Sequence, residues 1–350
     1  MAQLTEMVSP AVAGAVLRGV FALPAPVKRL IVGAPVRRDG QELALDAQLL
    51  LLMSRIEGKR NLTAATVEEA RDGLVRAKTL MSRVPARPVK TREVAIPEAV
   101  TARLYTPKGL PDGSPLLVFY HGGGWVIGDV ETHDTVCRYL AVHAEVRVLS
   151  VGYRLAPEHP YPAAADDART AYEYAVKNAV ELGADPLAIA VGGDSAGGNL
   201  AAVVALHAER RPDFALLFYP ATDVSVRRRS RELFAEGFYL TDGDMTWFID
   251  HYCPQDRRAE TTASPLLAED LGGFPPTYLV TAGFDPLRDE GEAFAERLAD
   301  AGVPVALRRQ EDLIHGFANM WSLGGRFQEA LSEAAGALRT GLYAGPRSRG

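Results

Sequence analysis

The stretch Val191-Gly192-Gly193-Asp194-Ser195-Ala196-Gly197-Gly198-Asn199 lies between the apolar run 187–190 and an alanine-rich segment that ends at His207. This order predicts a buried strand that runs directly into a helix, and the turn between them has the pattern Gly-x-Ser-x-Gly. A side chain at Gly193 or Gly197 would collide with the neighbouring strand or helix as the chain reverses. The pattern is typical of a nucleophile elbow, although a glycine-rich turn can also hold phosphate or be only a tight connection.

The composition excludes several classes of protein. The chain has 350 residues, of which 47% are hydrophobic, enough for the core of one large α/β domain or two ordinary ones. The formal net charge is −6 and the 38 basic residues are scattered, which argues against a nucleic-acid partner and favours small molecules. The two cysteines, Cys137 and Cys253, have no metal-ligand spacing. We therefore expect two buried thiols, no metal and no cofactor.

The pattern of the N-terminal segment predicts neither a signal peptide nor a membrane span. No apolar run approaches the roughly 20 residues that cross a bilayer, and no basic region precedes the apolar part of the segment before Pro24. We expect a cytoplasmic protein whose first segment is an amphipathic helix. Its helically spaced apolar residues favour packing on the main domain: Val12, Val16, Leu17 and Val20. The alternative is a surface helix that touches lipid, helped by the basic residues Lys28, Arg29, Arg37 and Arg38.

The rest of the chain divides into a helical preface and an alternating α/β part. Residues 1–90 are interrupted by prolines and predict further helices at 43–56 and 66–82, which together form a cap or brace. From 91 to 340, β-type runs alternate with helical stretches, the pattern of a mostly parallel, eight-stranded sheet with helices on both faces. The predicted strands are 92–96, 101–106, 115–120, 146–151, 187–191, 214–219, 277–282 and 304–308. The segment 227–264 breaks the alternation and predicts a helical insertion over the cleft.

Residues with useful chemistry follow the ends of predicted strands, where ligands of such sheets bind. The run His121-Gly122-Gly123-Gly124-Trp125 exposes backbone N–H groups suited to an oxyanion; a flexible loop or a phosphate-binding turn is the alternative. Asp285 follows the end of a strand and is placed to orient a histidine; the alternative is that it only caps a loop. Asp289 and Glu290 are more plausibly the first acids of the next helix, so Asp285 is the better candidate. His315 lies in a loop after the last strand. The order Ser195, Asp285, His315 is that of the α/β-hydrolase fold.

Five motifs in order carry a more specific resemblance. The chain resembles the hormone-sensitive-lipase-like family of α/β-hydrolases, in its Gly-Asp-Ser-Ala-Gly branch, from about residue 90 to 335. The motifs are His121-Gly-Gly-Gly-Trp125, Tyr153-Arg-Leu-Ala-Pro-Glu158, Gly193-Asp-Ser-Ala-Gly197, Asp285-Pro-Leu-Arg-Asp289 and His315-Gly-Phe317.

The resemblance implies a role for each matched residue. Ser195 is the expected nucleophile, His315 its base, and Asp285 the residue that orients the imidazole. The expected oxyanion-hole donors are the N–H groups of Gly122, Gly123 and Ala196. The family's pattern gives His121 a structural role, and we expect loop support from Glu158 and Asp194. Family members often pair through the last strand and helix, so a homodimer is a further expectation.

The substrate is predicted more coarsely. Aromatic residues near the cleft indicate an apolar substrate pocket: Trp125, Phe238, Tyr239 and Trp247. We expect a serine carboxylesterase or lipase-like enzyme acting on esters with short to medium acyl chains. An amidase or deacetylase of the same fold is the alternative, and a non-catalytic small-molecule receptor is a second one. Because the base must be neutral, activity is expected to rise through about pH 6 to 7.

Overall fold

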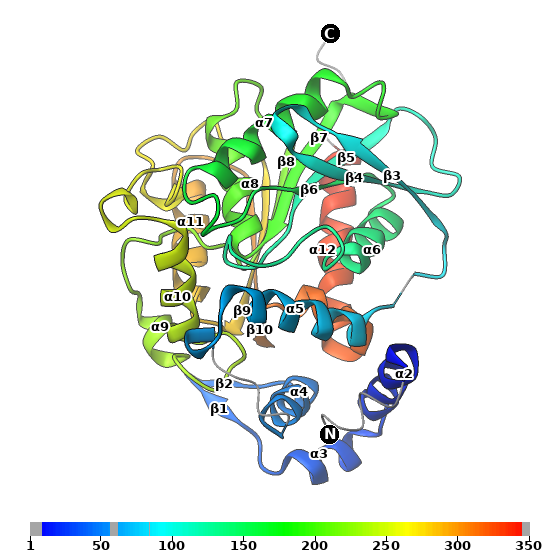
Figure 1. Ribbon diagram of the computed structural model, residues 1–350, viewed down its shortest axis with the longest axis vertical. Helices are drawn as coiled ribbons and strands as arrows, with labels where there is room; N and C mark the ends of the chain where they lie inside the picture. The colour runs from blue at the N-terminus through cyan, green and yellow to red at the C-terminus, as the bar shows by residue number, and fades with distance from the viewer. Residues whose placement is uncertain (1–8, 57–61, 84, 345–350) are drawn as a thin grey trace.

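The computed structural model describes residues 9–56, 62–83 and 85–344. At its centre is one eight-stranded sheet with the strand order β10-β9-β8-β7-β5-β6-β4-β3 (Figure 1). The six neighbouring strands β6, β5, β7, β8, β9 and β10 are parallel to one another. β4 pairs antiparallel with both β3 and β6. The mostly parallel sheet predicted from the alternating pattern is confirmed. The strands are β3 (Val89–Ala95), β4 (Thr101–Pro107), β5 (Ser114–Tyr120), β6 (Arg147–Gly152), β7 (Ala184–Asp194), β8 (Phe214–Phe218), β9 (Thr277–Phe284) and β10 (Val305–Ile314).

Helices cover both faces of this sheet. Along β5, Leu116, Val118 and Tyr120 belong to one hydrophobic cluster, while Leu117 and Phe119 belong to a second one. The first cluster is closed by α7 (Ala163–Lys177), α8 (Ala196–His207) and α11 (Arg288–Asp300), and the second by α6 (Asp134–Ala144) and α12 (Gly325–Tyr343). Every residue of β5 is buried because both faces are covered, which explains its continuous apolar run.

The preface is helical, as expected, but it contains one helix more than the pattern predicted. It comprises α2 (Pro10–Phe21), α3 (Ala25–Val32), the short hairpin β1 (Arg37–Arg38) and β2 (Gln41–Glu42), α4 (Leu45–Ile56), η1 (Leu62–Ala64) and α5 (Val67–Met81). The helix predicted before Pro24 is confirmed as α2, which ends at Phe21. The additional helix is α3, which has Pro24 as its N-cap and Pro26 in its first turn, where a missing N–H costs nothing.

The N-terminal helix packs on the domain through two of the four residues predicted to do so, Leu17 and Val20. Val12 and Val16 are 52% and 63% exposed, so the prediction that they pack on the domain is wrong. The packed face includes Leu17, Val20 and Gly14, where a Cβ atom would lie 2.7 Å from the carbonyl oxygen of Leu80 on α5. The close approach of the two helices at Gly14 turns Val12 and Val16 outward.

The insertion after β8 is helical and lies against the glycine loop. It contains α9 (Arg229–Leu233), α10 (Asp242–Tyr252) and η3 (Gln255–Arg257), and η4 (Pro265–Leu267) follows it. A Cβ atom on Gly124 would lie 2.2 Å from the ring of Phe248, so α10 packs directly on the loop that follows β5.

Three further observations bear on the predictions. The sheet begins at Val89, close to the predicted division at residue 90, and the division into two domains stays a prediction. Cys137 and Cys253 are both buried free thiols, as expected. Among the described residues, no helix is long and apolar enough to cross a membrane. The short 3-10 helices η2 (Pro97–Ala99) and η5 (Phe317–Leu323) complete the fold.

Candidate active site

Ser195 occupies a strained turn between β7 and α8. Its φ of +57° and ψ of −118° are rare for a residue with a side chain, and strain of this kind costs about 1–3 kcal/mol. The two flanking glycines have the steric reason that the sequence suggested. A Cβ atom on Gly197 would lie 1.9 Å from the carbonyl oxygen of Tyr120, and one on Gly193 would lie 2.4 Å from Gly197 itself. Helix and strand can approach this closely only without those side chains.

His315 and Asp285 lie beside the serine. The distance from His315 Nε2 to Ser195 Oγ is 3.0 Å, and His315 Nδ1 donates to Asp285 Oδ2 at 2.7 Å. The three residues come from the ends of β7, β9 and β10, which meet at the carboxyl edge of the sheet. β10 runs further than predicted, to Ile314, with an irregularity in its register after Gln310. His315 therefore follows directly on a strand.

Asp285 is fully buried and its second oxygen is also satisfied, because Oδ1 accepts the N–H of Leu287 at 2.8 Å. A carboxylate that is held at both oxygens cannot rotate away from the imidazole. This arrangement fixes the ring with Nε2 toward the serine.

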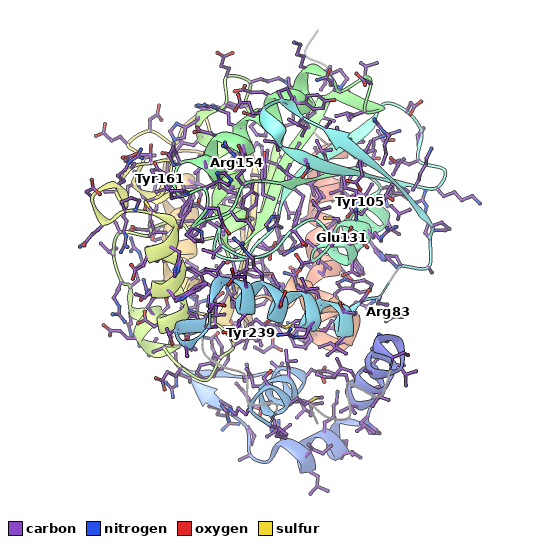
Figure 2. The ribbon with its side chains drawn as sticks, in the orientation of Figure 1. Arg83, Tyr105, Glu131, Arg154, Tyr161 and Tyr239 are labelled. Carbon is purple, nitrogen blue, oxygen red and sulfur yellow. The ribbon has the colours of Figure 1, made fainter. Side chains whose placement is uncertain are left out.

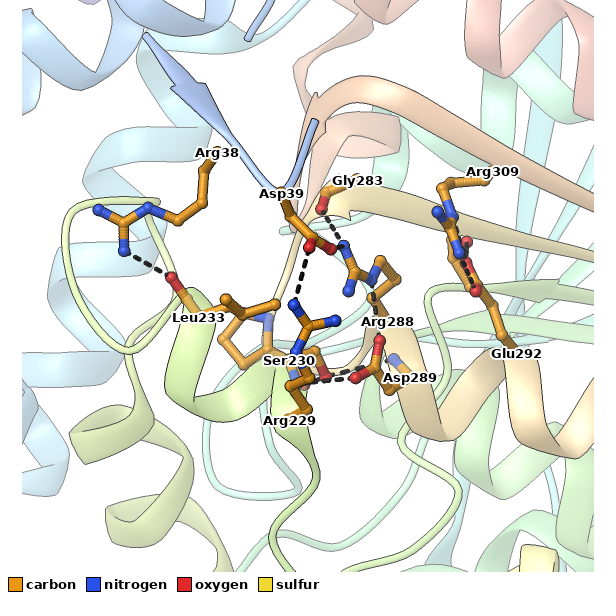
Figure 3. A network of polar contacts seen from close by, with 12 residues as sticks. Arg38, Asp39, Arg229, Ser230, Leu233, Gly283, Arg288, Asp289, Glu292 and Arg309 are labelled. Atoms are coloured by element: carbon orange, nitrogen blue, oxygen red, sulfur yellow. Dashed lines mark hydrogen bonds and ion pairs between the residues drawn. The ribbon is translucent and has the colours of Figure 1, made fainter. Parts of the chain in front are cut away.

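A polar network holds the segment that follows Asp285 (Figure 3). Arg288 bonds to Asp39 of the β1–β2 hairpin at 2.9 Å and to Asp289 at 2.9 Å. Asp289 in turn accepts the N–H of Ser230 from α9 at 2.8 Å. The preface and the insertion thus both support the turn that carries Asp285, and Arg288 and Asp289 are the last two residues of the fourth motif.

The glycine loop differs from the prediction at one residue. The N–H of Gly122 donates to Asp194 Oδ1 at 2.9 Å. The prediction of Gly122 as an oxyanion donor is therefore contradicted, because this N–H is already engaged. Among the described hydrogen bonds, none uses the N–H groups of Gly123, Gly124 or Ala196. Gly123 and Gly124 belong to the glycine loop, and Ala196 directly follows Ser195 in the elbow.

Asp194 is a buried centre of contacts. Its Oδ2 accepts Nδ2 of Asn319 at 2.8 Å, and Nε2 of His133 lies 3.2 Å from its Oδ1. Burial favours the neutral acid, but the interactions with His133 and with Lys78 on α5, together with the hydrogen bond from Asn319, lower the pKa of Asp194. The carboxylate therefore stays ionised and keeps its hold on Gly122.

His121 braces the loop and stays neutral. Its Nδ1 donates to the carbonyl of Gly122 at 2.9 Å, and its ring stacks on Tyr153 with the centroids 4.2 Å apart. Burial, followed by the charge of His133, lowers the pKa of His121 to about 4. This is the structural place that the resemblance gave to His121.

Arg71 joins the cap helix α5 to two loops at the site. Its guanidinium makes two 2.7 Å bonds to the carboxylate of Glu158 and donates to the carbonyls of Val126 at 3.0 Å and Ala156 at 3.1 Å. Val126 directly follows the glycine motif, so the cap and the glycine loop are held together. A surface hollow of about 410 Å³ lies beside this clamp.

The comparisons with known proteins agree with this geometry. A family described as having the α/β-hydrolase fold matches residues 117–319. The chain belongs to this family of α/β-hydrolases. The resemblance predicted from five sequence motifs is confirmed, and so is the α/β-hydrolase fold.

Several relatives of this α/β-hydrolase are ester hydrolases by name. It is 43% identical over 335 residues to the carboxylic ester hydrolase LipN of Mycobacterium tuberculosis. This match covers 91% of this chain and 89% of the relative. It is 39% identical over 252 residues to an ethyl acetate hydrolase of Pseudomonas putida, over 69% of this chain and 78% of the relative. A solved structure, the ester-hydrolase EH1AB1 from the metagenome of Lake Arreo, matches with a TM-score of 0.79 and 40% identity, over 85% of this chain and 98% of that one.

The predicted pocket residues of the hydrolase have different environments. Trp125 is 2% exposed and stacks on Tyr252, and Phe238 is buried against Phe234 and Phe284. Tyr239, labelled in Figure 2, lies beside Gly316, where a Cβ atom would be 3.4 Å from its ring. Trp247 is half-buried and packs on Phe248 and His251. The pocket itself stays a prediction.

The sequence reasoning missed several residues of the site: His133, Tyr219, Phe248, Asn319 and the cap residue Arg71. Tyr219 packs its ring 4.6 Å from that of His315. No motif spacing points to these side chains, because each reaches the site from a separate element. Among the described residues, no group of three or more His, Cys, Asp or Glu side chains is placed to hold a metal ion.

Proposed function

We propose that the protein is a serine carboxylesterase, which hydrolyses carboxylic esters through an acyl-serine intermediate. The single observation that carries this proposal is the chain of contacts from Ser195 Oγ to His315 Nε2 at 3.0 Å and from His315 Nδ1 to Asp285 at 2.7 Å. The carboxylic ester hydrolases among the relatives support the same reaction class.

The proposed reaction follows from the positions of these three side chains. Neutral His315 accepts the proton of Ser195 through Nε2 as Oγ attacks the ester carbonyl. Buried Asp285 stabilises the imidazolium that forms. The imidazolium then gives its proton to the leaving alcohol, and an acyl-serine remains. Water, deprotonated by the same histidine, attacks the acyl-serine and releases the carboxylic acid.

We assign the oxyanion hole to the N–H groups of Gly123, Gly124 and Ala196. Gly123 and Ala196 were expected from the sequence, and Gly124 replaces Gly122 because the N–H of Gly122 is held by Asp194. Loss of one such donor in comparable sites costs about 3–4 kcal/mol of transition-state stabilisation. The contacts of Asp194 and of Arg71 would keep this loop in place before substrate arrives.

Finer properties remain predictions. We expect short- to medium-chain esters, with Tyr239 and Trp247 as the predicted pocket residues that the fold leaves partly exposed. A cytoplasmic location is also only predicted. The expected homodimer has some support in the position of β10, which is an edge strand of the sheet and is exposed along much of its length.

The test is a panel of p-nitrophenyl esters of increasing acyl length, hydrolysed by the wild type and by Ser195→Ala. We expect hydrolysis that depends on Ser195 and is fastest with short to medium chains. A matching p-nitroanilide series separates an esterase from an amidase. Full activity in Ser195→Ala would contradict the proposal, and no hydrolysis by the wild type would favour a non-catalytic receptor.

A further inference from the structure

The two N-terminal helices expose apolar side chains to solvent. Among the side chains described on α2, the exposed positions are Val12, Ala15, Val16 and Gly19, and on α3 they are Ala25, Pro26, Val27, Leu30 and Ile31. Leu30 is 85% exposed and Val16 is 63% exposed. Among these described exposed positions, none is charged or polar. A surface helix of a globular protein normally shows the opposite arrangement, with its apolar stripe facing the core.

The charged residues of the same helices point toward the protein. Lys28 is buried, donates to the carbonyl of Phe21 at 3.1 Å and pairs with Asp46 of α4. Arg29 donates to Gln48 at 3.2 Å, and Arg18 to the carbonyl of Ser82 at 3.3 Å. The helices are therefore anchored to the domain through polar contacts. Their outer, apolar faces are left without a partner within the described chain.

The helices α2 and α3 that carry these faces lie at one end of the molecule, beyond α5 in Figure 1. We call Val12, Val16, Val27, Leu30 and Ile31 the docking face. The chain continues from it through the exposed apolar residues 33–36 to Arg37 and Arg38, both of which are exposed.

The charge around the docking face is opposite to that of the whole chain. Residues 9–56 contain six basic and three acidic side chains, whereas the complete chain has a net charge of −6. The stretch from 9 to 38 contains basic residues and no acidic one. Part of this charge is paired, because Lys28 contacts Asp46 and Arg37 contacts Glu42 at 2.8 Å. The remaining excess of basic side chains beside an apolar face is complementary to a bilayer, which is apolar inside and anionic at its surface.

We propose that the docking face binds the surface of an anionic phospholipid bilayer. Val16, Leu30 and Ile31 enter the boundary between headgroups and acyl chains, and Arg37 and Arg38 lie at the level of the phosphates. A second copy of the chain fits this face less well, because a two-fold pair would bring the same positive segment against itself. The proposal concerns where the enzyme works and goes beyond its chemistry.

The test uses the full chain and vesicles of phosphatidylcholine mixed with phosphatidylglycerol, compared with pure phosphatidylcholine, in a flotation assay. The wild type is expected to float with the mixed vesicles and to be released by raised salt. Leu30→Glu is expected to weaken binding at least about tenfold. The matched control is Val180→Glu, which changes an equally exposed valine, 79% accessible, in the segment after α7 and is expected to bind like the wild type.

A second variant tests the charge. Arg38→Gln is expected to weaken binding to mixed vesicles several-fold, since each basic residue near the membrane adds to the attraction. Arg38 donates to the carbonyl of Leu233, whereas Arg37 pairs with the carboxylate of Glu42. The proposal is overturned if the wild type does not float with mixed vesicles, or if Leu30→Glu floats as well as Val180→Glu. It is also overturned if sedimentation shows a dimer that Leu30→Glu dissociates. Hydrolysis of a soluble p-nitrophenyl ester, measured in every preparation, separates a failure of docking from a failure of the proposed esterase.

Discussion

Asp194 holds Gly122: the N–H of the glycine donates to Oδ1 of the aspartate at 2.9 Å. The residue immediately before Ser195 thus fixes the first glycine of the loop that follows the neighbouring strand β5. Ser195 and the glycine loop are both held beside one buried carboxylate, whose other oxygen is bound by Asn319. This contact separates the roles of the three glycines, because only the N–H groups of Gly123 and Gly124 remain for the substrate.

Replacement of this carboxylate should impair catalysis more than binding. In Asp194→Ala the buried N–H of Gly122 loses its acceptor, at a cost of about 1–3 kcal/mol, and the loop relaxes away from its position. We expect kcat to fall about tenfold to a hundredfold with a smaller change in KM. Asn319→Ala removes only one contact of Asp194 and should show a smaller loss. An unchanged kcat in a folded Asp194→Ala protein would show that the loop is held without this contact.

The contacts of Arg71 with Glu158 and with two backbone carbonyls predict a larger loss of stability in Arg71→Ala than in Glu158→Gln. Arg71→Ala removes the ion pair with Glu158 and also the bonds to two backbone carbonyls, so it should destabilise the protein by about 1–3 kcal/mol. Glu158→Gln affects only a partly exposed ion pair and should cost less than about 1 kcal/mol. Amide hydrogen exchange over α5 measures the loosening of the cap.

The control is Arg76→Ala, which replaces an exposed arginine of the same helix. Exchange over α5 in this variant should equal that of the wild type. If Arg71→Ala and Arg76→Ala gave the same exchange rates, Arg71 would not act as a clamp.

Two glycine substitutions should have opposite effects. In Gly197→Ala the new methyl group would lie 1.9 Å from the carbonyl oxygen of Tyr120, so the elbow must distort, and soluble protein or activity should be lost. Gly336 lies within α12 with nothing within 4 Å of its added Cβ. Gly336→Ala should therefore stabilise the protein by about 0.5–1 kcal/mol. Thermal unfolding with esterase assays distinguishes the two, and a fully active Gly197→Ala enzyme would refute the steric account of the elbow.

Glu290 should make stability depend on pH. Burial raises the pKa of its carboxyl from 4.5 to about 8, despite the N–H groups of Thr222 and Asp223 that favour the ionised form. A raised folded-state pKa adds stability that is fully present below about pH 4.5 and is lost as the pH rises through about 8.

The effect can be isolated by comparing variants. Between pH 5 and 8 this group lowers the free energy of unfolding by at most about 1.4 kcal/mol per pH unit. Glu290→Gln should show a flatter dependence than the wild type in urea unfolding at several pH values. Glu296→Gln, on the exposed side of α11, should follow the wild type. Equal slopes for Glu290→Gln and the wild type would refute the shifted pKa.

The sequence predicted the frame of the enzyme well, because buried strands, elbow glycines and helix caps are local signals. The helix predicted to begin at Thr66, for example, has a capping box there: the Thr66 side chain accepts the N–H of Glu69, and the N–H of Thr66 donates to the Glu69 carboxylate. The positions of Ser195, Asp285 and His315 at strand ends follow from the topology of a parallel sheet. Their contacts could be expected from the chain order alone.

What the sequence could not supply depends on contacts between distant segments. The engagement of Gly122 by Asp194, 72 positions away, cannot be read from a run of three glycines. The exposed face of α2 depends on the close approach of Gly14 to α5, which periodicity does not specify. Likewise, Pro24 and Pro26 are residues that usually end a helix, but they lie at the N-cap and in the first turn of α3.

The site of covalent acylation tests most directly whether Ser195 is the nucleophile. The wild type is treated with p-nitrophenyl acetate, quenched in acid during the initial burst, and digested for mass spectrometry. The account predicts an acetyl group on the peptide that contains Ser195, in an amount close to that of the enzyme, and no such adduct in Ser195→Ala. An acetyl group at the same level on another residue, with hydrolysis preserved in Ser195→Ala, would contradict it.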